Sequence, residues 1–195
     1  MTLQEYLNEI GIYQRYHKID ENRIPELDSV KKYCLEIEKN IQAGRGLLIM
    51  GTVGVGKTSM LSYIAQQIYN LNQRPIKIDF KTNTAIGYRK YSMSVLRATQ
   101  LYKLFFTKNS DLSIYETCNL FGLDDFGTEY NTDFPMSLFE DFVETRYSKM
   151  LATIITTNFS PDKIKQLTQY ERIIDRWRET TDQIVISSKY KSQRR

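Results

Sequence analysis

Apolar and polar positions along the chain predict a mixed α/β fold. Short apolar runs typical of buried strands occur at 46–50, 91–96, 117–123, 151–157 and 183–187. The segments between them place apolar residues three or four positions apart, as on one face of a helix. Strands that alternate with helices favour a parallel sheet covered by helices on both faces. A chain of 195 residues is long enough for one domain with a full hydrophobic core.

Helical periodicity and its capping signals place the expected helices. Seven are expected: one within 2–16 that ends at Gly11, one from Asp28 or Ser29 to Gly44, one that starts near Ser59, one after Thr99, one from Asp133 or Ser137 to Tyr147, one over 161–167 and one over 170–178. The stretch 72–98 is different, because Pro75–Phe80 and Tyr91–Leu96 both alternate like strands around a polar segment with Gly87. We expect a hairpin-like excursion there, with 91–96 as the core strand.

The distribution of polar residues, the single histidine and the two cysteines indicate the domain organisation and the cellular compartment. A first helix and a polar linker over 1–27 are expected to precede a main domain over 28–195 that ends in a short basic tail. The single histidine, His17, falls in that linker, where an exposed position is expected rather than a catalytic one. Two isolated cysteines, no leader pattern and no apolar run of membrane-spanning length indicate a cytoplasmic protein without a membrane association.

The run Gly46–Thr58 carries the strongest chemical signal. An apolar strand is followed by Gly-x-x-x-x-Gly-Lys-Thr and an amphipathic helix, the arrangement of a phosphate-binding loop. Glycines let consecutive amide groups converge on one anion, and the helix directs its partly positive N-terminus at the same phosphates. A chance match in a glycine turn is the alternative, but the strand, the helix and every motif position are present. We expect a nucleoside triphosphate to be bound by Gly51, Thr52, Gly54, Val55, Gly56, Lys57, Thr58 and Ser59.

Two acids follow a second buried strand, about 65 residues after the loop lysine. A magnesium-dependent triphosphatase needs one carboxylate for the metal and one to polarise the attacking water. We assign Asp124 to Mg²⁺, together with the hydroxyl of Thr58, and Asp125 to the role of general base.

Polar residues near the end of the chain supply three further candidates. Asn158 follows the strand 151–157, where the ends of parallel strands gather around ligands, so it can orient water near the terminal phosphate. A turn or capping asparagine is the alternative for this residue. Arg172 and Arg176 lie four residues apart on one helical face, where exposed ion pairs with neighbouring acids are the competing explanation.

The ordered set of motifs resembles the AAA+ ATPases of the DnaC/DnaI helicase-loader and IstB transposition-helper group. It consists of the phosphate loop, Leu-Asp-Asp-Phe-Gly at 123–127, Thr-Thr-Asn at 156–158 and Glu-Arg-x-x-x-Arg at 171–176, and 11–16 is similar to the segment that enters the domain in that group. The resemblance implies a P-loop α/β/α sandwich with a five-stranded parallel sheet, ATP and Mg²⁺ as ligands, and self-assembly into a ring or spiral.

The same resemblance implies roles for individual residues. Lys57 and Thr58 take the Walker A roles and Asp124 and Asp125 the Walker B roles, although most AAA+ ATPases have glutamate in place of Asp125. Asn158 takes the sensor I role. Arg172 takes the role of an arginine finger that reaches a neighbouring subunit's site, and Arg176 belongs to the same motif. Lys191 falls where a sensor II arginine is expected, and lysine lacks the bidentate fork.

These roles lead to an ATP-hydrolysing accessory factor of DNA replication that resembles a helicase loader, with slow turnover stimulated by assembly or DNA. Single-stranded DNA and a replicative helicase are the expected partners; tyrosines beside basic residues at 88–91 and 102–103 suit stacking and phosphate contact. Three alternatives remain. They are a transposition helper that binds double-stranded DNA and a transposase, a nucleotide-dependent switch with little turnover, and a small-molecule kinase, against which the motifs at 156–158 and 171–176 speak.

Overall fold

Five parallel strands form the centre of the domain. The computed structural model describes residues 1–79, 84–88, 90–127, 136–187 and 189–190, and for 77–79 and 84–86 the backbone alone. The strands are β1 (Gly46–Met50), β4 (Met93–Arg97), β5 (Leu120–Phe126), β6 (Ala152–Thr157) and β7 (Thr181–Val185), in the spatial order β4-β5-β6-β1-β7. The predicted five-stranded parallel sheet is therefore confirmed, and β6 lies between the strand of the phosphate loop and the strand of the two acids.

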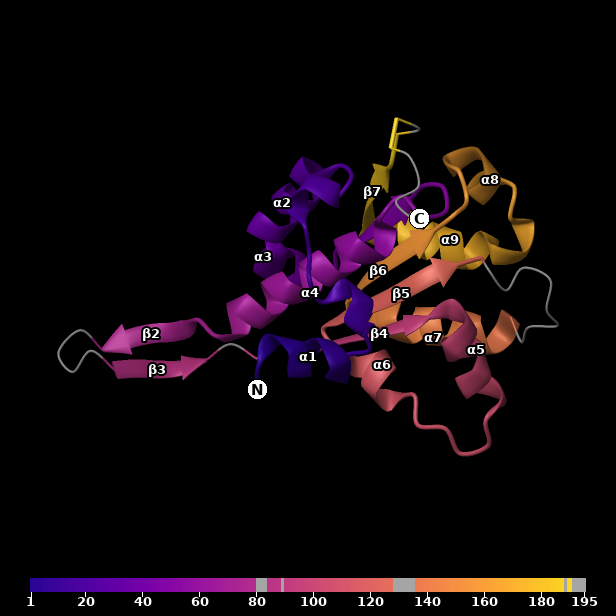
Figure 1. Cartoon of the computed structure of the whole chain (residues 1–195). Coiled ribbons are helices and arrows are strands. Elements are labelled where there is room, and N and C mark those ends of the chain that lie inside the picture. The colour runs from indigo at the N-terminus through magenta and orange to yellow at the C-terminus, as the bar shows by residue number, and fades with distance from the viewer. Residues whose placement is uncertain (80–83, 89, 128–135, 188, 191–195) are drawn as a thin grey trace.

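Helices cover both faces of this sheet, as Figure 1 shows. One face carries α1 (Leu3–Glu9), α2 (Leu27–Leu35), α3 (Ile37–Gln42) and α4 (Lys57–Asn72). The other carries α5 (Ala98–Phe106), α6 (Ser113–Thr117), α7 (Met136–Ser148), α8 (Pro161–Lys165) and α9 (Glu171–Thr180). Short 3₁₀ turns lie at Gln14–Tyr16, Glu21–Arg23 and Thr168–Tyr170. Within the described residues, no helix combines the length and the apolar character needed to cross a bilayer.

Strand periodicity explains why two separate cores form. On β1, Leu47 and Ile49 pack toward α4, whereas Leu48 and Met50 pack toward α7 and α9. Each of these side chains is almost completely buried, which contributes about 1.5–3 kcal/mol per side chain. A strand buried on both faces is apolar throughout, and this is why β1 appears in the sequence as an uninterrupted run.

The N-terminal segment is attached to the sheet and to α4. Thr2 and Glu5 form a capping box at the start of α1, and the ring of Tyr6 lies 5.5 Å from that of Tyr69 on α4. The Ile10 carbonyl accepts a 2.6 Å hydrogen bond from the amide of Val95 on the edge strand β4. The structure shows this packing, and the domain boundary at residue 27 stays a prediction.

The expectation that His17 is exposed is wrong. Its side chain is buried, and its ring nitrogen Nε2 lies 2.9 Å from the Ile12 carbonyl oxygen, which closes the turn between them. The ring contacts a backbone carbonyl five residues earlier in the chain, and the sequence gives no sign of this contact.

Several element boundaries differ from expectation. The helix expected from Asp28 or Ser29 begins at Leu27 and is broken at Glu36, where the Asn40 side chain donates a 3.1 Å hydrogen bond to the Tyr33 carbonyl. This side chain satisfies an acceptor that a continuous helix would satisfy from its backbone. The last strand starts two residues before the expected Gln183. The helix α7 starts at Met136, one residue before the expected Ser137. The other expected start, Asp133, lies outside the described residues.

The stretch 72–98 forms the expected hairpin, although its second strand was not predicted. β2 (Pro75–Asp79) pairs antiparallel with β3 (Thr84–Tyr88), and β4 is the core strand. In Figure 1 the hairpin projects from the domain, at the left of the view. β3 falls in a polar segment, where few apolar residues alternate with polar ones and a strand is therefore hard to predict.

Candidate active site

The phosphate loop connects β1 to α4 with a backbone that requires glycine. Gly54 and Gly56 have φ values of 81° and 106°, in the left-handed region that a side chain makes costly. Gly51 is required for space, since a Cβ atom there would lie 2.9 Å from Cβ of Ile186. The loop therefore leads the chain into the first turn of α4, which begins at Lys57.

Lys57 is buried and its ammonium group points to three oxygen atoms. It donates to the carbonyls of Gly51 and Thr52, at 2.8 and 2.9 Å, and to Oδ1 of Asn158 at 2.7 Å. The side chain thus joins the loop to the end of β6. Because these oxygens belong to neutral groups, phosphate oxygens can replace them as stronger partners of the charge.

Asp124 lies next to Thr58 at the start of α4. The Thr58 hydroxyl lies 3.0 Å from Oδ2 of Asp124, and Thr156 on β6 donates a 2.7 Å hydrogen bond to Oδ1. Burial raises the pKa of the Asp124 carboxyl above its ordinary value, and the nearby Asp125 adds to this, against the lowering effect of the two threonine hydroxyls. Mg²⁺ prefers hard oxygen ligands, so the Thr58 hydroxyl and the Asp124 carboxylate fit the metal that the sequence predicts.

A β-bulge directs both acids to the same side of the sheet. Leu123 pairs with Ile155 and Phe126 with Thr157, so Asp124 and Asp125 together oppose Thr156. Asp125 takes a left-handed backbone conformation with φ 58°, and its amide donates a 2.9 Å hydrogen bond to Thr156 Oγ1. In a regular strand, consecutive side chains would point to opposite faces.

A cavity of about 440 Å³ brings the loop and the acids together. It is lined by Arg15, Tyr16, Lys18, Ile19, Asp20, Arg23, Val53, Gly54, Gly56, Lys57, Thr58, Ser59, Asp125 and Asn158. This size is in the range of small-molecule sites. Side chains from four regions of the sequence thus meet in one hollow that can hold a nucleotide.

The predicted binding residues take different positions around this cavity. Gly54, Gly56, Lys57, Thr58, Ser59, Asp125 and Asn158 line it, and Gly51 and Thr52 contact Lys57 through their carbonyls. Val55 is buried among core residues. Lys191, Arg89 and most of the basic tail lie outside the described residues, so the sensor II role of Lys191 stays a prediction.

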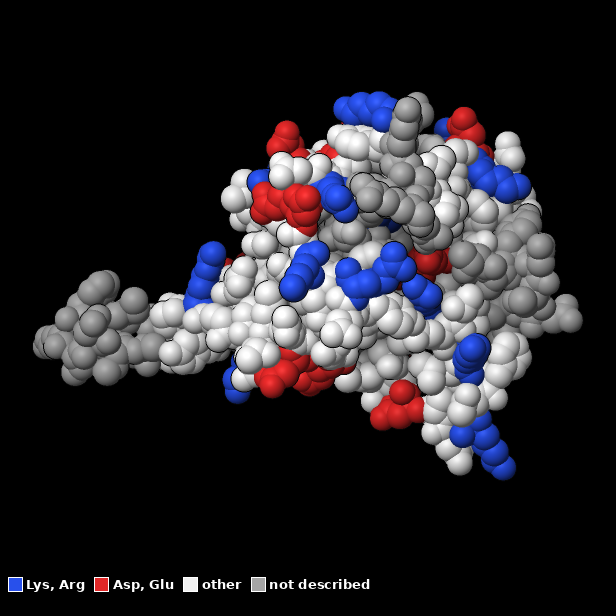
Figure 2. All heavy atoms as spheres, in the orientation of Figure 1, with Lys and Arg blue, Asp and Glu red and all other residues white. Residues whose placement is uncertain are grey.

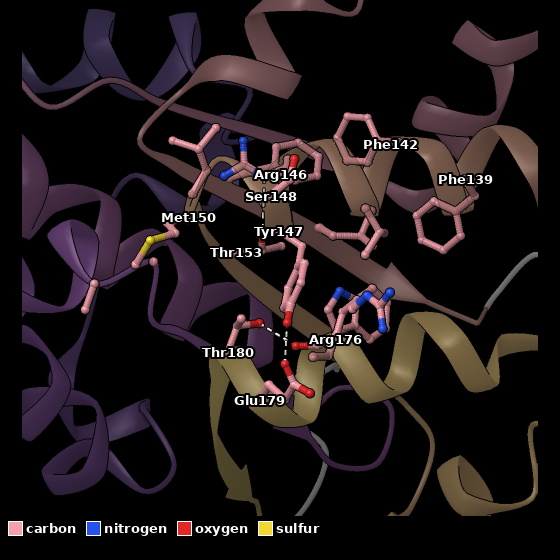
Figure 3. Close-up of a pocket in the computed structure, with 17 residues that line it drawn as sticks. Phe139, Phe142, Arg146, Tyr147, Ser148, Met150, Thr153, Arg176, Glu179 and Thr180 are labelled. Carbon is pink, nitrogen blue, oxygen red and sulfur yellow. Dashed lines mark hydrogen bonds between the residues drawn. The ribbon is translucent and has the colours of Figure 1, made fainter.

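Arg172 and Arg176 lie on α9, away from this cavity. Arg172 is exposed and pairs with Glu140 on α7 at 3.7 Å, while Arg176 donates to Glu144 at 3.0 Å. Figure 3 shows Arg176 at the edge of a second, largely apolar cavity of about 370 Å³ between α7, α9 and the sheet. Within one chain, the structure does not bring either arginine to the phosphate loop.

Sequence reasoning missed two sets of residues. Thr156 contacts both acids, yet the motif at 156–158 indicated a role for Asn158 alone. The N-terminal residues Arg15, Lys18 and Arg23 line the cavity, although they precede Gly51, the first residue of the loop, by 28 to 36 positions. Basic residues in a polar linker gave no reason to place them there.

Comparison with known proteins agrees with this fold. No protein-family model matches the chain. The replicative helicase loader DnaI of Bacillus subtilis (strain 168) is 26% identical over 136 residues, an alignment that covers 66% of this chain and 38% of that protein. The crystal structure of the DnaC helicase loader matches with a TM-score of 0.60 at 21% identity, over 94% of this chain and 99% of the other.

The replication initiator DnaA, in a structure with AMPPCP and single-stranded DNA, matches with a TM-score of 0.58 at 19% identity. That match covers 91% of this chain and 51% of the DnaA chain. The chain thus has the P-loop AAA+ fold of these proteins and is similar in sequence to a helicase loader.

Proposed function

We propose that this AAA+ chain is an ATPase that acts in DNA replication as an accessory factor of the helicase-loader kind. The observation that carries the proposal is the meeting of Lys57, Thr58, Asp125 and Asn158 in one cavity, with Asp124 in contact with Thr58. The similarity to DnaI, and the fold shared with DnaC and DnaA, support a replication role over the transposition-helper alternative.

The geometry supports a hydrolytic mechanism. The loop amides and Lys57 bind the β- and γ-phosphates, and Lys57 exchanges its carbonyl partners for phosphate oxygens. Thr58 and Asp124 would hold Mg²⁺, which when bound neutralises charge on the phosphates. Asn158 orients a water molecule, and Asp125 accepts its proton as the water oxygen attacks the γ-phosphorus and ADP leaves.

The assembly proposal follows from the position of Arg172. Its side chain is 83% exposed and does not line the nucleotide cavity of its own chain, so it is available to a neighbouring subunit. We infer a ring or spiral in which Arg172 stabilises charge on the phosphate bound by the next subunit. The ion pair between Arg176 and Glu144 joins α9 to α7 and so helps to orient the helix that carries Arg172.

Hydrolysis tests the proposal directly. Purified chain should release phosphate from ATP, with stimulation by single-stranded DNA, and Lys57→Ala should abolish this release. Lys39→Ala is the matched control, because Lys39 is an exposed lysine of α3 that pairs with Glu36. Phosphate release by Lys57→Ala at the wild-type rate would contradict the assignment.

The partner is tested separately. A pulldown from the native host in the presence of ATP should recover a replicative helicase. Recovery of a transposase would favour the transposition helper. Tight ATP binding without turnover, with or without DNA, would favour a nucleotide-dependent switch.

A further inference from the structure

The segment before α2 forms one wall of the nucleotide cavity. It contributes Arg15, Lys18 and Arg23 to the lining, together with Asp20. Figure 2 shows Lys and Arg side chains grouped near the centre of the visible face, and this segment connects α1 to α2 on the same face in Figure 1. None of these three cations belongs to the phosphate loop or to the acid-bearing strand.

Helix α4 holds this segment in place. Ser62 donates a 2.7 Å hydrogen bond to the Tyr16 carbonyl, and Gln66 donates a 3.2 Å hydrogen bond to the carbonyl of His17. The buried ring of His17 closes the preceding turn on Ile12. Because α4 also carries Lys57 and Thr58, the wall and the phosphate-binding residues are attached to one rigid helix.

The charge of the wall suits a polyphosphate. The described lining of the cavity contains four cations, which are Arg15, Lys18, Arg23 and Lys57, and two carboxylates, Asp20 and Asp125. A nucleoside triphosphate carries several negative charges, so a net positive lining stabilises it. Arginine suits this task because its planar fork can donate two parallel hydrogen bonds to a phosphate.

Each of the two arginines has a weak contact that it can exchange for a phosphate. The Arg15 guanidinium lies 5.1 Å from the centre of the Tyr16 ring, and Nε of Arg23 lies 3.5 Å from a carboxylate oxygen of Asp20. The Arg23 pair is largely exposed, with side-chain exposures of 69% and 53%, and pairs of this kind contribute about 0–1 kcal/mol. Exchanging the Arg23–Asp20 pair for a phosphate therefore costs little.

We propose that Arg15 and Arg23 are nucleotide-binding residues, which contact the polyphosphate in cis from the wall formed by the N-terminal segment. This inference rests on the proposed function, since it concerns the same nucleotide. It makes the segment part of the site, so that ATP binding holds residues 14–23 against α4. The contact depends on the number of phosphates, and it is stronger for ATP than for ADP.

The test measures the affinity of the full chain for fluorescent analogues of ATP and ADP at two salt concentrations. Arg15→Gln and Arg23→Gln should each weaken ATP binding by about 5- to 50-fold, the loss expected for a partly exposed charged hydrogen bond. ADP binding should weaken less, and the salt dependence should decrease. Arg15→Lys should recover part of the loss because it restores the charge.

Arg45→Gln is the matched control. Arg45 is also a half-exposed arginine in an ion pair, at 3.0 Å from Asp182, and it does not line the cavity. Thermal unfolding without nucleotide should be the same for all variants, which separates a contact with ATP from a structural role.

Wild-type affinity in both glutamine variants, with Lys57→Ala unable to bind, would overturn this inference and leave the proposed function intact. Equal losses for ATP and ADP would also overturn it, because the contact would not be to the polyphosphate. Failure of the wild-type chain to bind ATP would overturn both.

Discussion

Asp124→Asn should stabilise the nucleotide-free protein while it impairs catalysis. The carboxylate is buried, with 2% of the residue exposed, and lies beside a second acid. Taking an ion out of water costs several kcal/mol in a folded protein, and the hydrogen bonds from Thr58 and Thr156 each offset about 1.5–3 kcal/mol of this. Asparagine has the same shape and keeps an acceptor for Thr156, without the charge.

Replacing buried charged groups by neutral ones of similar volume often stabilises a protein, and for Asp124→Asn we expect a gain of about 1–2 kcal/mol in the free energy of unfolding at neutral pH. For a domain of this size, that raises the Tm by about 2–8 °C. The gain depends on pH, because the folded-state pKa of Asp124 is raised above its unfolded value. Between the unfolded-state and folded-state pKa values, the folded protein binds more protons than the unfolded chain. The free energy of unfolding of the wild type therefore falls as the pH rises through this interval. The advantage of the variant should disappear as the pH is lowered through the same interval.

Thermal unfolding measured by circular dichroism from acidic to neutral pH, without Mg²⁺ or nucleotide, tests this reasoning. Added Mg²⁺ and ATP should reverse the order of stability, since a ligand stabilises in proportion to its binding and the variant lacks the metal-binding carboxylate. Asp162→Asn is a suitable control, because it makes the same change at an acid of α8 whose side chain is 88% exposed. An Asp124→Asn variant that unfolds at a lower temperature than wild type at neutral pH would refute the argument.

Three further predictions concern turnover. Asp125→Asn should keep ATP binding and lower the rate of phosphate release about 100-fold or more, as expected for the loss of a general base. Asparagine tolerates the left-handed backbone at this position, so the fold should be preserved. An unchanged rate would exclude Asp125 as the base. Thr156→Val removes the hydroxyl that contacts both acids. It should lower the free energy of unfolding by about 1–3 kcal/mol, measured by chemical denaturation, and slow ATP hydrolysis more than it weakens ATP binding. Mixtures of Arg172→Ala and Asp125→Asn subunits should recover activity at mixed interfaces, and no recovery at any ratio would argue against an arginine that acts in trans.

The local chemistry of the phosphate loop could be predicted because its determinants are consecutive in the sequence. Glycines at 54 and 56 specify a backbone that few other residues adopt, and Lys57 and Thr58 follow directly on the first turn of a helix. The sheet was predictable for a related reason, since strands buried on both faces appear as apolar runs. The resemblance implied five parallel strands, whereas their spatial order became known only from the structure.

The wall of the cavity formed by residues 14–23 could not be predicted in this way. Its position depends on hydrogen bonds from Ser62 and Gln66 to carbonyls of Tyr16 and His17, and backbone carbonyls carry no sequence signal. The buried state of His17 has the same origin, because its partner is the carbonyl of Ile12.

The sequence by itself determined that a nucleotide-binding loop, two adjacent acids and a polar strand end belong to one chain. Only the tertiary structure decided how the two acids point. A regular strand would turn Asp124 and Asp125 to opposite faces of the sheet. The bulge opposite Thr156 instead places Asp124 beside Thr58, Asp125 on the nucleotide cavity and Phe126 in the aromatic core. This outcome depends on pairing with β6, about 30 residues further along the chain, so the local pattern of β5 cannot specify it.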